Sequence, residues 1–391
     1  MSEGRTSPTH TGWILMNDRK SFCAIYGNRL YVLFLTCREL HNDNMMNGIS
    51  TVFDLRNCTK VNTLGTNCIQ ISDNSQNVIK LETENKTQTL MWLFAIKFGL
   101  KYQASLSLDG FRKISVIGQD SFGDVCLMQR FADNKLYAIK SFPKDFLGNK
   151  FSAELVEMYL IPNHKNIAGI SISFATKDMI YIGIEYPIGG EMIFNAISES
   201  VLFSQFFQVA EAINHCHMND VVVKAFTPEN LLLDHENNVV LCDFGLKTKR
   251  EVNEYSSPEA IINHSLGVES NWWAYGVMLY EMAVGTSPFL HEDESKMSEL
   301  ILKSTPNLSL IDNNHLKDII SGLLEKSPKR RTTYGIIKTH QFFKSSLEHE
   351  ISCSNNMLFK EMDFSSVLTD LSDQDLFAIM NLKYPNILMA N

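Results

Sequence analysis

Several features of secreted and membrane-embedded proteins are missing from this sequence. Its 391 residues contain no uninterrupted apolar run that approaches the length of a membrane span. The polar start MSEGRTSPTHTG has no signal-peptide core, so we expect a cytoplasmic protein. The eight cysteines show no paired C-x-x-C spacing. The absence of that spacing favours reduced thiols over a disulfide framework or a metal cluster.

Concentrated charge and internal repeats are missing as well. The net charge is −9, and no block of like charge stands out, which argues against nucleic acid as the main partner. No repeat of 20 to 50 residues is evident, so a solenoid is excluded. A hydrophobic fraction of 45% is ample for packed cores, and the length suggests two or three domains.

The first hundred residues combine short strand patterns with one helix pattern. We predict strands over residues 11–16, 21–25, 29–35, 50–55, 68–72 and 77–83. An amphipathic helix is predicted over 84–102, capped by Asn85 or Thr87. Its buried stripe is predicted to be Leu90, Leu93, Phe94 and Ile96. Strands closed by a single helix predict a small barrel or sandwich.

This N-terminal pattern resembles the pleckstrin homology (PH) domain. The resemblance is carried by GW in the first strand and by Trp92 in the helix, and it gives a PH-like domain over residues 1–105. Phosphoinositide-binding members place cations across the first two strands. Here the loop offers Arg19 and Lys20, while apolar or thiol side chains stand at Met16, Cys23 and Ile25. We therefore expect weak contact with anionic lipid and transient membrane association, or simply a solvated basic pair.

From residue 111 the chain shows an ordered series of motifs. IGQDSFGDV and YAIK read as a glycine hairpin followed by a lysine-bearing strand, an arrangement suited to phosphates. IEYPIGGEM, KAFTPEN, CDFG, SPE, NWWAYG and PKRRT follow in order to residue 343. This order and spacing resemble the protein kinase family.

Details of the series resemble the AGC group of serine/threonine kinases. EYPIGGEMIF, the WW before AYGVMLYEM, and HQFF carry this resemblance, and the added N-terminal domain is similar to protein kinase B. The resemblance implies the α+β class: a β-rich small lobe and a helical large lobe over 111–343, with ATP between them. It also implies a C-terminal tail over 344–391, whose aromatic anchors would be Phe359, Phe364 and Phe377.

The resemblance assigns site residues one position at a time. Lys140 matches the phosphate-anchoring lysine and Glu157 its ion-pair partner, with Glu154 as the competing choice. The expected metal ligands for Mg²⁺ are Asn230 and Asp243. The full set of residues matched to ATP-binding positions is Gly118, Gly123, Val125, Ala138, Lys140, Glu157, Glu185, Tyr186, Glu191 and Leu232. The alternative is that Lys140, Asn230 and Asp243 are polar residues inherited with the fold, in a site that binds no ATP.

Departures from the family pattern gather at the catalytic loop. Ala225 stands where the resemblance expects the catalytic aspartate, and Thr227 where it expects a lysine, so no catalytic residue is intact. A general base is worth about 10² to 10⁴ in rate. Lys224 replaces the arginine that would pair with a phosphorylated activation segment. That segment is short, since only 16 positions separate Asp243 from Glu259.

Two further substitutions surround this loop. Asp120 replaces the second glycine of the hairpin and puts a carboxylate near the expected phosphates. Asn271 replaces the aspartate that braces the catalytic loop, and its amide keeps hydrogen bonding but carries no charge. In contrast, Glu259 and Arg331 retain the ion pair that braces the large lobe.

The sequence therefore supports three hypotheses. The first is a catalytically impaired kinase-like protein with weak ATP binding, which acts on a protein partner as a regulatory or binding module. The second is an active serine/threonine kinase acting on a protein substrate, in which Asp120 or Glu229 supplies the missing carboxylate. The third is membrane recruitment alone, with both domains as passive binding surfaces.

Overall fold

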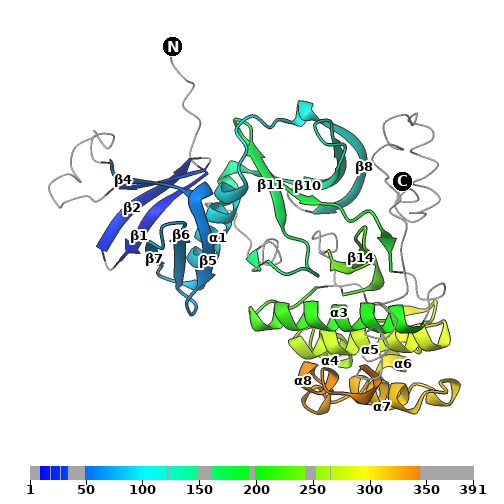
Figure 1. Ribbon diagram of the computed structural model, residues 1–391. Coiled ribbons are helices and arrows are strands. Elements are labelled where there is room, and N and C mark those ends of the chain that lie inside the picture. Colours follow the sequence, from blue (N-terminus) through cyan, green and yellow to red (C-terminus); the bar gives the residue numbers. More distant parts are fainter. Residues whose placement is uncertain are drawn as a thin grey trace, which may run out of the picture. The chain divides into compact units, whose positions relative to one another are not determined.

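The structure is a computed structural model of the chain. It describes residues 9–17, 19–26, 28–33, 49–120, 123–147, 160–161, 163–192, 199–224, 226–242, 252–264 and 266–343. These residues form two compact units (Figure 1). The first comprises Met1–Asn163 and Gly169–Tyr186, and the second comprises His164–Ala168, Pro187–Asp243 and Lys247–Asn391. The predicted tail with its three phenylalanines lies outside the described residues.

The first unit begins with a seven-stranded antiparallel sheet. The strand order is β4-β3-β2-β1-β7-β6-β5. Its strands are β1 His10–Met16, β2 Arg19–Tyr26, β3 Arg29–Leu33, β4 Ile49–Asp54, β5 Cys58–Thr63, β6 Cys68–Asp73 and β7 Val78–Glu82. No ladder joins β4 to β5 among the residues described, so the closed barrel expected from the sequence is not confirmed. The unpredicted strand is β5, whose sequence CTKVNT lacks the alternation of apolar and polar residues that marks a half-buried strand.

Three residues that the resemblance to the PH domain had singled out, Met16, Cys23 and Ile25, point into the core of the N-terminal sheet. Met16 is 5% exposed, and Cys23 and Ile25 are fully buried, while Leu15, which lies between the buried Ile14 and Met16 in β1, is 41% exposed. Burial of the thiol raises the pKa of Cys23 to about 12. The apolar character of these positions therefore reflects packing. Interpreting them as missing lipid-binding cations was wrong, because a cation there would point into the core.

Helix α1 (Lys86–Lys101) follows the sheet, and Asn85 is its cap. The Asn85 side-chain oxygen accepts a hydrogen bond from the Gln88 amide at 3.0 Å, which settles the choice between Asn85 and Thr87. The sequence predicted one buried stripe. The structure instead buries residues on nearly every face, namely Thr89, Trp92, Leu93, Phe94, Ala95, Ile96, Phe98 and Gly99. A helix buried all round must be covered on two sides.

A second sheet, of five antiparallel strands, completes the first unit. The strand order is β11-β12-β10-β9-β8. The strands are β8 Phe111–Asp120, β9 Gly123–Arg130, β10 Leu136–Pro143, β11 Ile170–Ala175 and β12 Met179–Glu185. A core of Phe111, Tyr137, Ile139, Ile172 and Phe174 lies on one face of this sheet. We refer to this sheet, together with the 3-10 turn Lys144–Leu147, as the small lobe.

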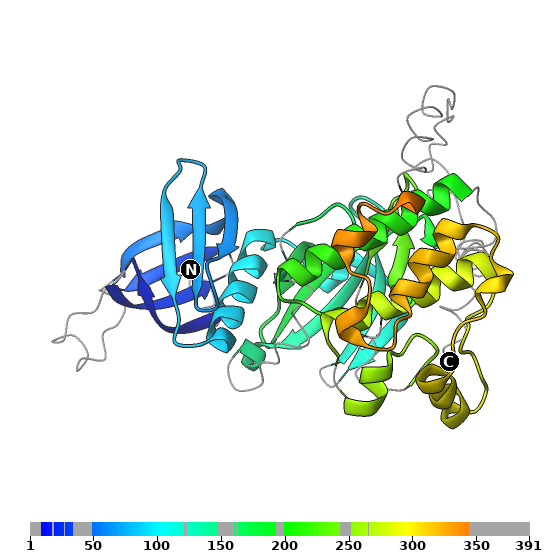
Figure 2. The same ribbon diagram turned by 90° about the horizontal axis from the view of Figure 1, so that it is seen from below.

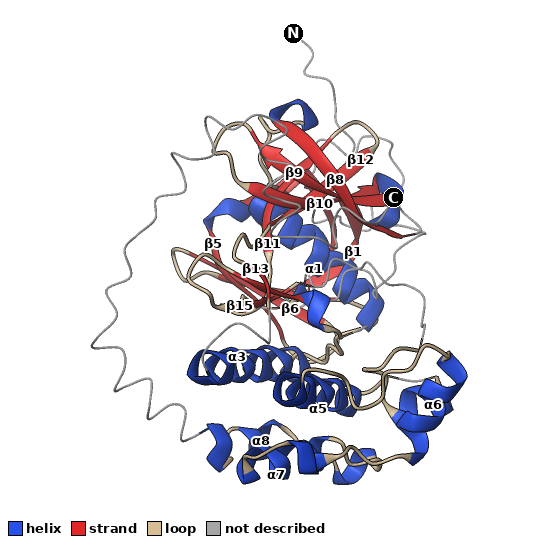
Figure 3. Ribbon diagram, turned by 90° about the vertical axis from the view of Figure 1, so that its right-hand side faces the viewer, coloured by secondary structure: helices blue, strands red, loops and turns tan. Residues whose placement is uncertain are grey.

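The second unit is mainly helical (Figures 2 and 3). Its helices are α3 Glu199–Met218, α4 Pro258–Asn263, α5 Val268–Val284, α6 Glu294–Lys303, α7 Asn314–Leu323 and α8 Tyr334–Ile337. A three-stranded sheet of β13 Gly190–Glu191, β14 Leu231–Leu233 and β15 Val239–Leu241 accompanies them.

Helix α5 forms the centre of the second unit. Trp273 and Tyr275 are fully buried in it, and the Tyr275 hydroxyl donates to the Phe206 carbonyl of α3 at 2.9 Å. Gly276 permits close approach to α7, since a Cβ there would lie 2.7 Å from Leu323 Cβ. None of the helices described is both long and apolar enough to cross a bilayer.

Candidate active site

Three residues matched to ATP-binding positions lie in one row across the small lobe. Lys140 of β10 is the register partner of Val125 in β9, and Val125 is the partner of Gly118 in β8. Lys140 is only 3% exposed, and its ammonium lies 5.7 Å from the centre of the Phe142 ring. A buried cation in one row with a glycine of the hairpin, one strand beyond Val125, suits phosphate oxygens, because backbone and ligand can approach closely at a glycine.

The end of β12 carries the residues expected to meet the base. The Glu185 carboxylate is 2.6 Å from Lys135 Nζ, and both side chains are about half exposed. The Tyr186 amide donates to the Leu136 carbonyl at 2.8 Å, which ties the end of β12 to the start of β10. Ala138 pairs with Ile184 in the same ladder, so the predicted residues Ala138, Glu185 and Tyr186 lie close together along β10 and the end of β12.

In the second unit, Glu191 of β13 is paired with Leu232 of β14. The structure therefore brings together the predicted ribose contact and one of the predicted apolar base contacts. Partial burial, and next the nearby charge of Glu229, raise the pKa of the Glu191 carboxyl. Glu229 is thus close enough to Glu191 for the two carboxylates to repel each other.

Asn230, the predicted metal ligand, lies in the 3-10 turn Pro228–Asn230 with its amide oxygen already engaged. Its Oδ1 accepts hydrogen bonds from the Thr227 hydroxyl at 3.2 Å and from the Thr227 amide at 3.3 Å. Its Nδ2 donates to the Cys242 carbonyl at 3.3 Å. The threonine that replaces the expected lysine therefore occupies the oxygen that a magnesium ion would need. An ion bound at this oxygen would compete with the two Thr227 donors.

Asn271 of α5 braces the segment before position 225 through three hydrogen bonds. Its Oδ1 accepts from the Val223 amide at 3.0 Å, and its Nδ2 donates to the Val223 carbonyl at 2.7 Å. The same Oδ1 accepts from His217 Nε2 at 2.9 Å. Because Oδ1 can only accept, His217 Nε2 is the donor, and burial lowers the pKa of this ring. The bracing that the sequence analysis expected from an amide is confirmed, and His217 is a partner that it missed.

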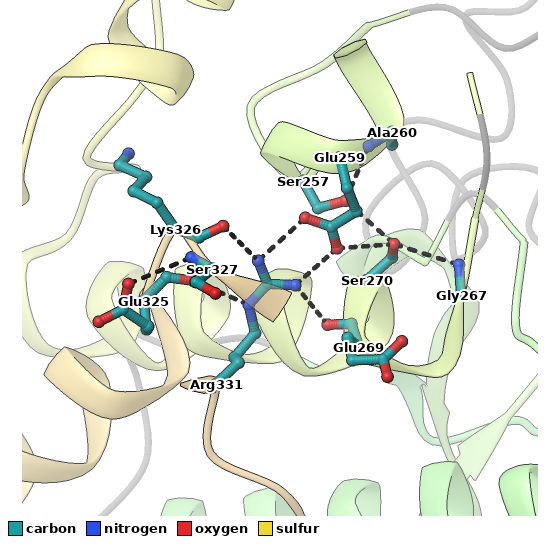
Figure 4. Close-up of polar contacts among 10 residues, drawn as sticks. All are labelled: Ser257, Glu259, Ala260, Gly267, Glu269, Ser270, Glu325, Lys326, Ser327 and Arg331. Carbon is teal, nitrogen blue, oxygen red and sulfur yellow. Dashed lines mark hydrogen bonds and ion pairs between the residues drawn. The ribbon is translucent and has the colours of Figure 1, made fainter. Parts of the chain in front are cut away.

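Glu259 and Arg331 form a bidentate ion pair in the second unit (Figure 4). The guanidinium makes two hydrogen bonds to the carboxylate, at 2.6 and 2.9 Å, and Arg331 is 3% exposed. It also donates to the carbonyls of Glu269, Glu325 and Lys326. Burial acts to raise the pKa of Glu259, but the hydrogen bonds and charge of Arg331 outweigh it and lower that pKa.

Several predicted site positions are not tested by these observations. Glu157, Ala225 and Asp243 lie outside the described residues, as does the side chain of Asp120. Among the residues that are described, no cluster of histidine, cysteine, aspartate and glutamate could hold a metal ion. Of the predicted site residues that are described, the first unit carries the buried Lys140, and the second unit carries Asn230 together with the mutually repelling Glu191 and Glu229.

Comparison with known proteins gives a match over the region that carries these residues. The protein kinase domain model matches residues 111–343. Protein kinase 2 of Dictyostelium discoideum is 30% identical over 268 residues, which cover 63% of this chain and 56% of the relative. The human RAC-beta serine/threonine-protein kinase is 28% identical over 270 residues, with the same two shares. The serine/threonine-protein kinase gad8 of Schizosaccharomyces pombe is 29% identical over 308 residues, covering 68% and 54%. The chain thus matches little more than half the length of these relatives.

Proposed function

Because the chain belongs to the protein kinase family and is related to serine/threonine kinases, we propose that it is a catalytically impaired member of AGC type. In this proposal it keeps part of the nucleotide site and serves as a regulatory or binding module for a protein partner. Members of the family use ATP and Mg²⁺, and the residues that would hold them here are Lys140, Asn230 and Asp243.

The observation that carries the proposal is the turn at Thr227. Both the hydroxyl and the amide of Thr227 donate to Asn230 Oδ1. Thr227 is 4% exposed, so water does not readily compensate for bonds lost there. A lysine at this position would supply a cation to the transferring phosphate. The threonine supplies none and lowers the capacity of Asn230 to hold a metal ion.

The sequence at the preceding loop position adds to this. Ala225 has no group that can orient a substrate hydroxyl or accept its proton. The loss of such a group alone reduces the rate by about 10² or more. Ala225 affects proton transfer, and the engaged Asn230 affects metal binding. Restoring a carboxylate at position 225 would therefore not restore metal binding at Asn230.

Retained residues favour a second candidate, an active serine/threonine kinase with atypical catalytic residues. Lys140 is buried and pairs with Val125, whose other partner is Gly118 of the hairpin, an arrangement that suits a phosphate-binding lysine. Glu229 lies two residues beyond Thr227 and acts electrostatically on Glu191. In that candidate Glu229 or Asp120 replaces the missing base.

One set of measurements on the purified full chain separates the two candidates. Melting is recorded with ATP, with and without magnesium, and phosphate transfer to a basic peptide is measured in parallel. We expect a small melting shift and a transfer rate at least about 10² below that of an intact serine/threonine kinase. Transfer at ordinary kinase rates that is abolished by Asp243→Ala would refute impairment. Loss of that activity in Glu229→Gln, but not in Glu236→Gln, would then identify Glu229 as the base.

A further inference from the structure

Helix α1 of the N-terminal domain packs directly against the small lobe within the first unit (Figure 1). The Phe94 ring meets the Phe142 ring edge-on at 5.8 Å and the Phe146 ring at 6.1 Å, measured between ring centres. All three rings are fully buried. Phe142 is the penultimate residue of β10 and Phe146 lies in the turn that follows, so a residue of one domain completes the core of the other.

The backbone that leaves α1 joins the edge strand of the small lobe. The Ser173 hydroxyl of β11 donates to the Phe98 carbonyl at 2.6 Å, and Ser173 is fully buried. The Gln103 amide donates to the Ser173 carbonyl at 2.9 Å, and Tyr102 forms a parallel bridge with Ser173. The connection between the domains is therefore hydrogen-bonded to the small lobe and does not act as a free tether.

A third contact is made by Lys97 on the same helix. Its ammonium donates to the carbonyls of Leu160 and Ile161, each at 2.7 Å. Both of those residues are 6% exposed, so their carbonyls have little access to water. Burial lowers the pKa of Lys97 to about 8, as expected for a cation taken out of water. Without Lys97 the two carbonyls would lose a charged donor, a loss that costs more than that of a neutral one.

A fourth contact comes from the first strand. The His10 imidazole meets the Trp92 ring of α1 edge-on at 4.6 Å and hydrogen-bonds the Leu147 backbone of the small lobe. Apolar, backbone and charged contacts thus all link the same two bodies. They involve β1, α1 and the connection on one side, and β10, β11 and Leu160–Ile161 on the other.

We propose that α1 clamps the N-terminal domain onto the small lobe as one cooperative unit, with Lys97 as the positioning residue that holds Leu160 and Ile161. The occupant of this face of α1 is the small lobe of the same chain. Glu157 precedes Leu160 by three residues in the sequence. The clamp therefore holds two residues that closely follow, in the sequence, the predicted partner of Lys140. In this arrangement the N-terminal domain is a fixed support of the small lobe.

Hydrogen–deuterium exchange of the full chain tests the clamp without any ligand. Lys97→Met keeps the stem and removes the donor, Lys97→Arg keeps a charged donor, and Lys101→Met is the matched control on the exposed end of the same helix. For Lys97→Met we expect exchange at least 10-fold faster in α1 and in β11 together, because the buried carbonyls lose their partner. Lys97→Arg should remain within about 3-fold of the parent, and Lys101→Met should match it.

Two results would overturn the proposal. The first is unchanged exchange in Lys97→Met, and the second is faster exchange in α1 with β11 unaffected. If Lys97→Met fails to fold, Ser173→Ala decides, because it removes a single hydrogen bond at the same junction. We expect this variant to exchange about 5-fold faster at both α1 and β11. Equal exchange to the parent at either element would contradict a cooperative clamp.

Discussion

At the scale of single residues, the hydroxyl of Thr227 is predicted to oppose magnesium binding at Asn230. Thr227→Val removes the hydroxyl that donates to Asn230 Oδ1 and preserves side-chain volume. We expect magnesium–ATP to bind about 5-fold more tightly, as for the release of one hydrogen bond. Thr227→Ser keeps the hydroxyl and is the control. Titration calorimetry with and without magnesium measures the effect, and equal affinity in all three proteins would contradict the role given to Thr227.

A second residue-scale prediction concerns the charge of the hairpin. Asp120 stands at a glycine position of the predicted phosphate-binding turn. Its carboxylate should repel the phosphates, so Asp120→Gly and the isosteric Asp120→Asn should both tighten ATP binding. The titration is best carried out at low ionic strength, where screening is small. Unchanged or weaker binding in Asp120→Asn would show that the carboxylate does not face the nucleotide.

At the scale of elements, Arg331 joins the start of α4 to the turns that follow α7. It binds Glu259 on α4 and the carbonyls of Glu325 and Lys326 beyond α7. Arg331→Met leaves the Glu259 carboxylate partly buried without its partner, and we expect the free energy of unfolding to fall by about 3 to 5 kcal/mol. Glu259→Gln combined with Arg331→Met should recover part of that loss in urea unfolding. A fall below about 1 kcal/mol would contradict the buried-pair argument.

The elements also show how far the sequence alone could lead. A cap at Asn85 or Thr87 and hydrogen bonding by the Asn271 amide follow from local pattern and motif, and the structure contains the cap at Asn85 and the bonds of Asn271. Strand β5 was missed because its polar sequence carries no period. The second covering of α1 was missed because its contacts come from far along the chain, with Ser173 75 positions beyond Phe98. Local periodicity detects that a face is buried but cannot identify a distant partner.

At the scale of the whole molecule, His10 is predicted to make stability depend on acid pH. Burial lowers its pKa from 6.5 to about 4 in the folded chain. The unfolded chain therefore binds more protons between about pH 4 and 6.5, and stability should fall as pH drops through that window. The loss attributable to His10 is on the order of 3 kcal/mol. Urea unfolding of His10→Gln should show a flatter profile than the parent, and identical profiles would exclude His10 as the cause.

Membrane contact is the second property of the whole molecule that can be tested. Arg19 and Lys20 are the cations that the sequence offers to a lipid surface, each worth roughly 1 kcal/mol at most. We expect the full chain to pellet weakly with anionic vesicles at about physiological salt and without headgroup selectivity. Arg19→Ala with Lys20→Ala should abolish what binding remains. Tight and headgroup-selective pelleting would show that a lipid site exists on this domain.

The hydrogen-bonded connection over residues 102–110 has a consequence for competition. Even fully extended it reaches only about 30 Å, so a domain that lost its docking contacts could not move far. A partner held by so short a tether has an effective concentration in the millimolar range. A second protein that binds the small-lobe surface contacted by Phe94 would have to compete with α1, which is tethered to that surface by the same chain. Weak and transient ligands of that surface are therefore excluded by proximity, and only a tight binder could displace α1.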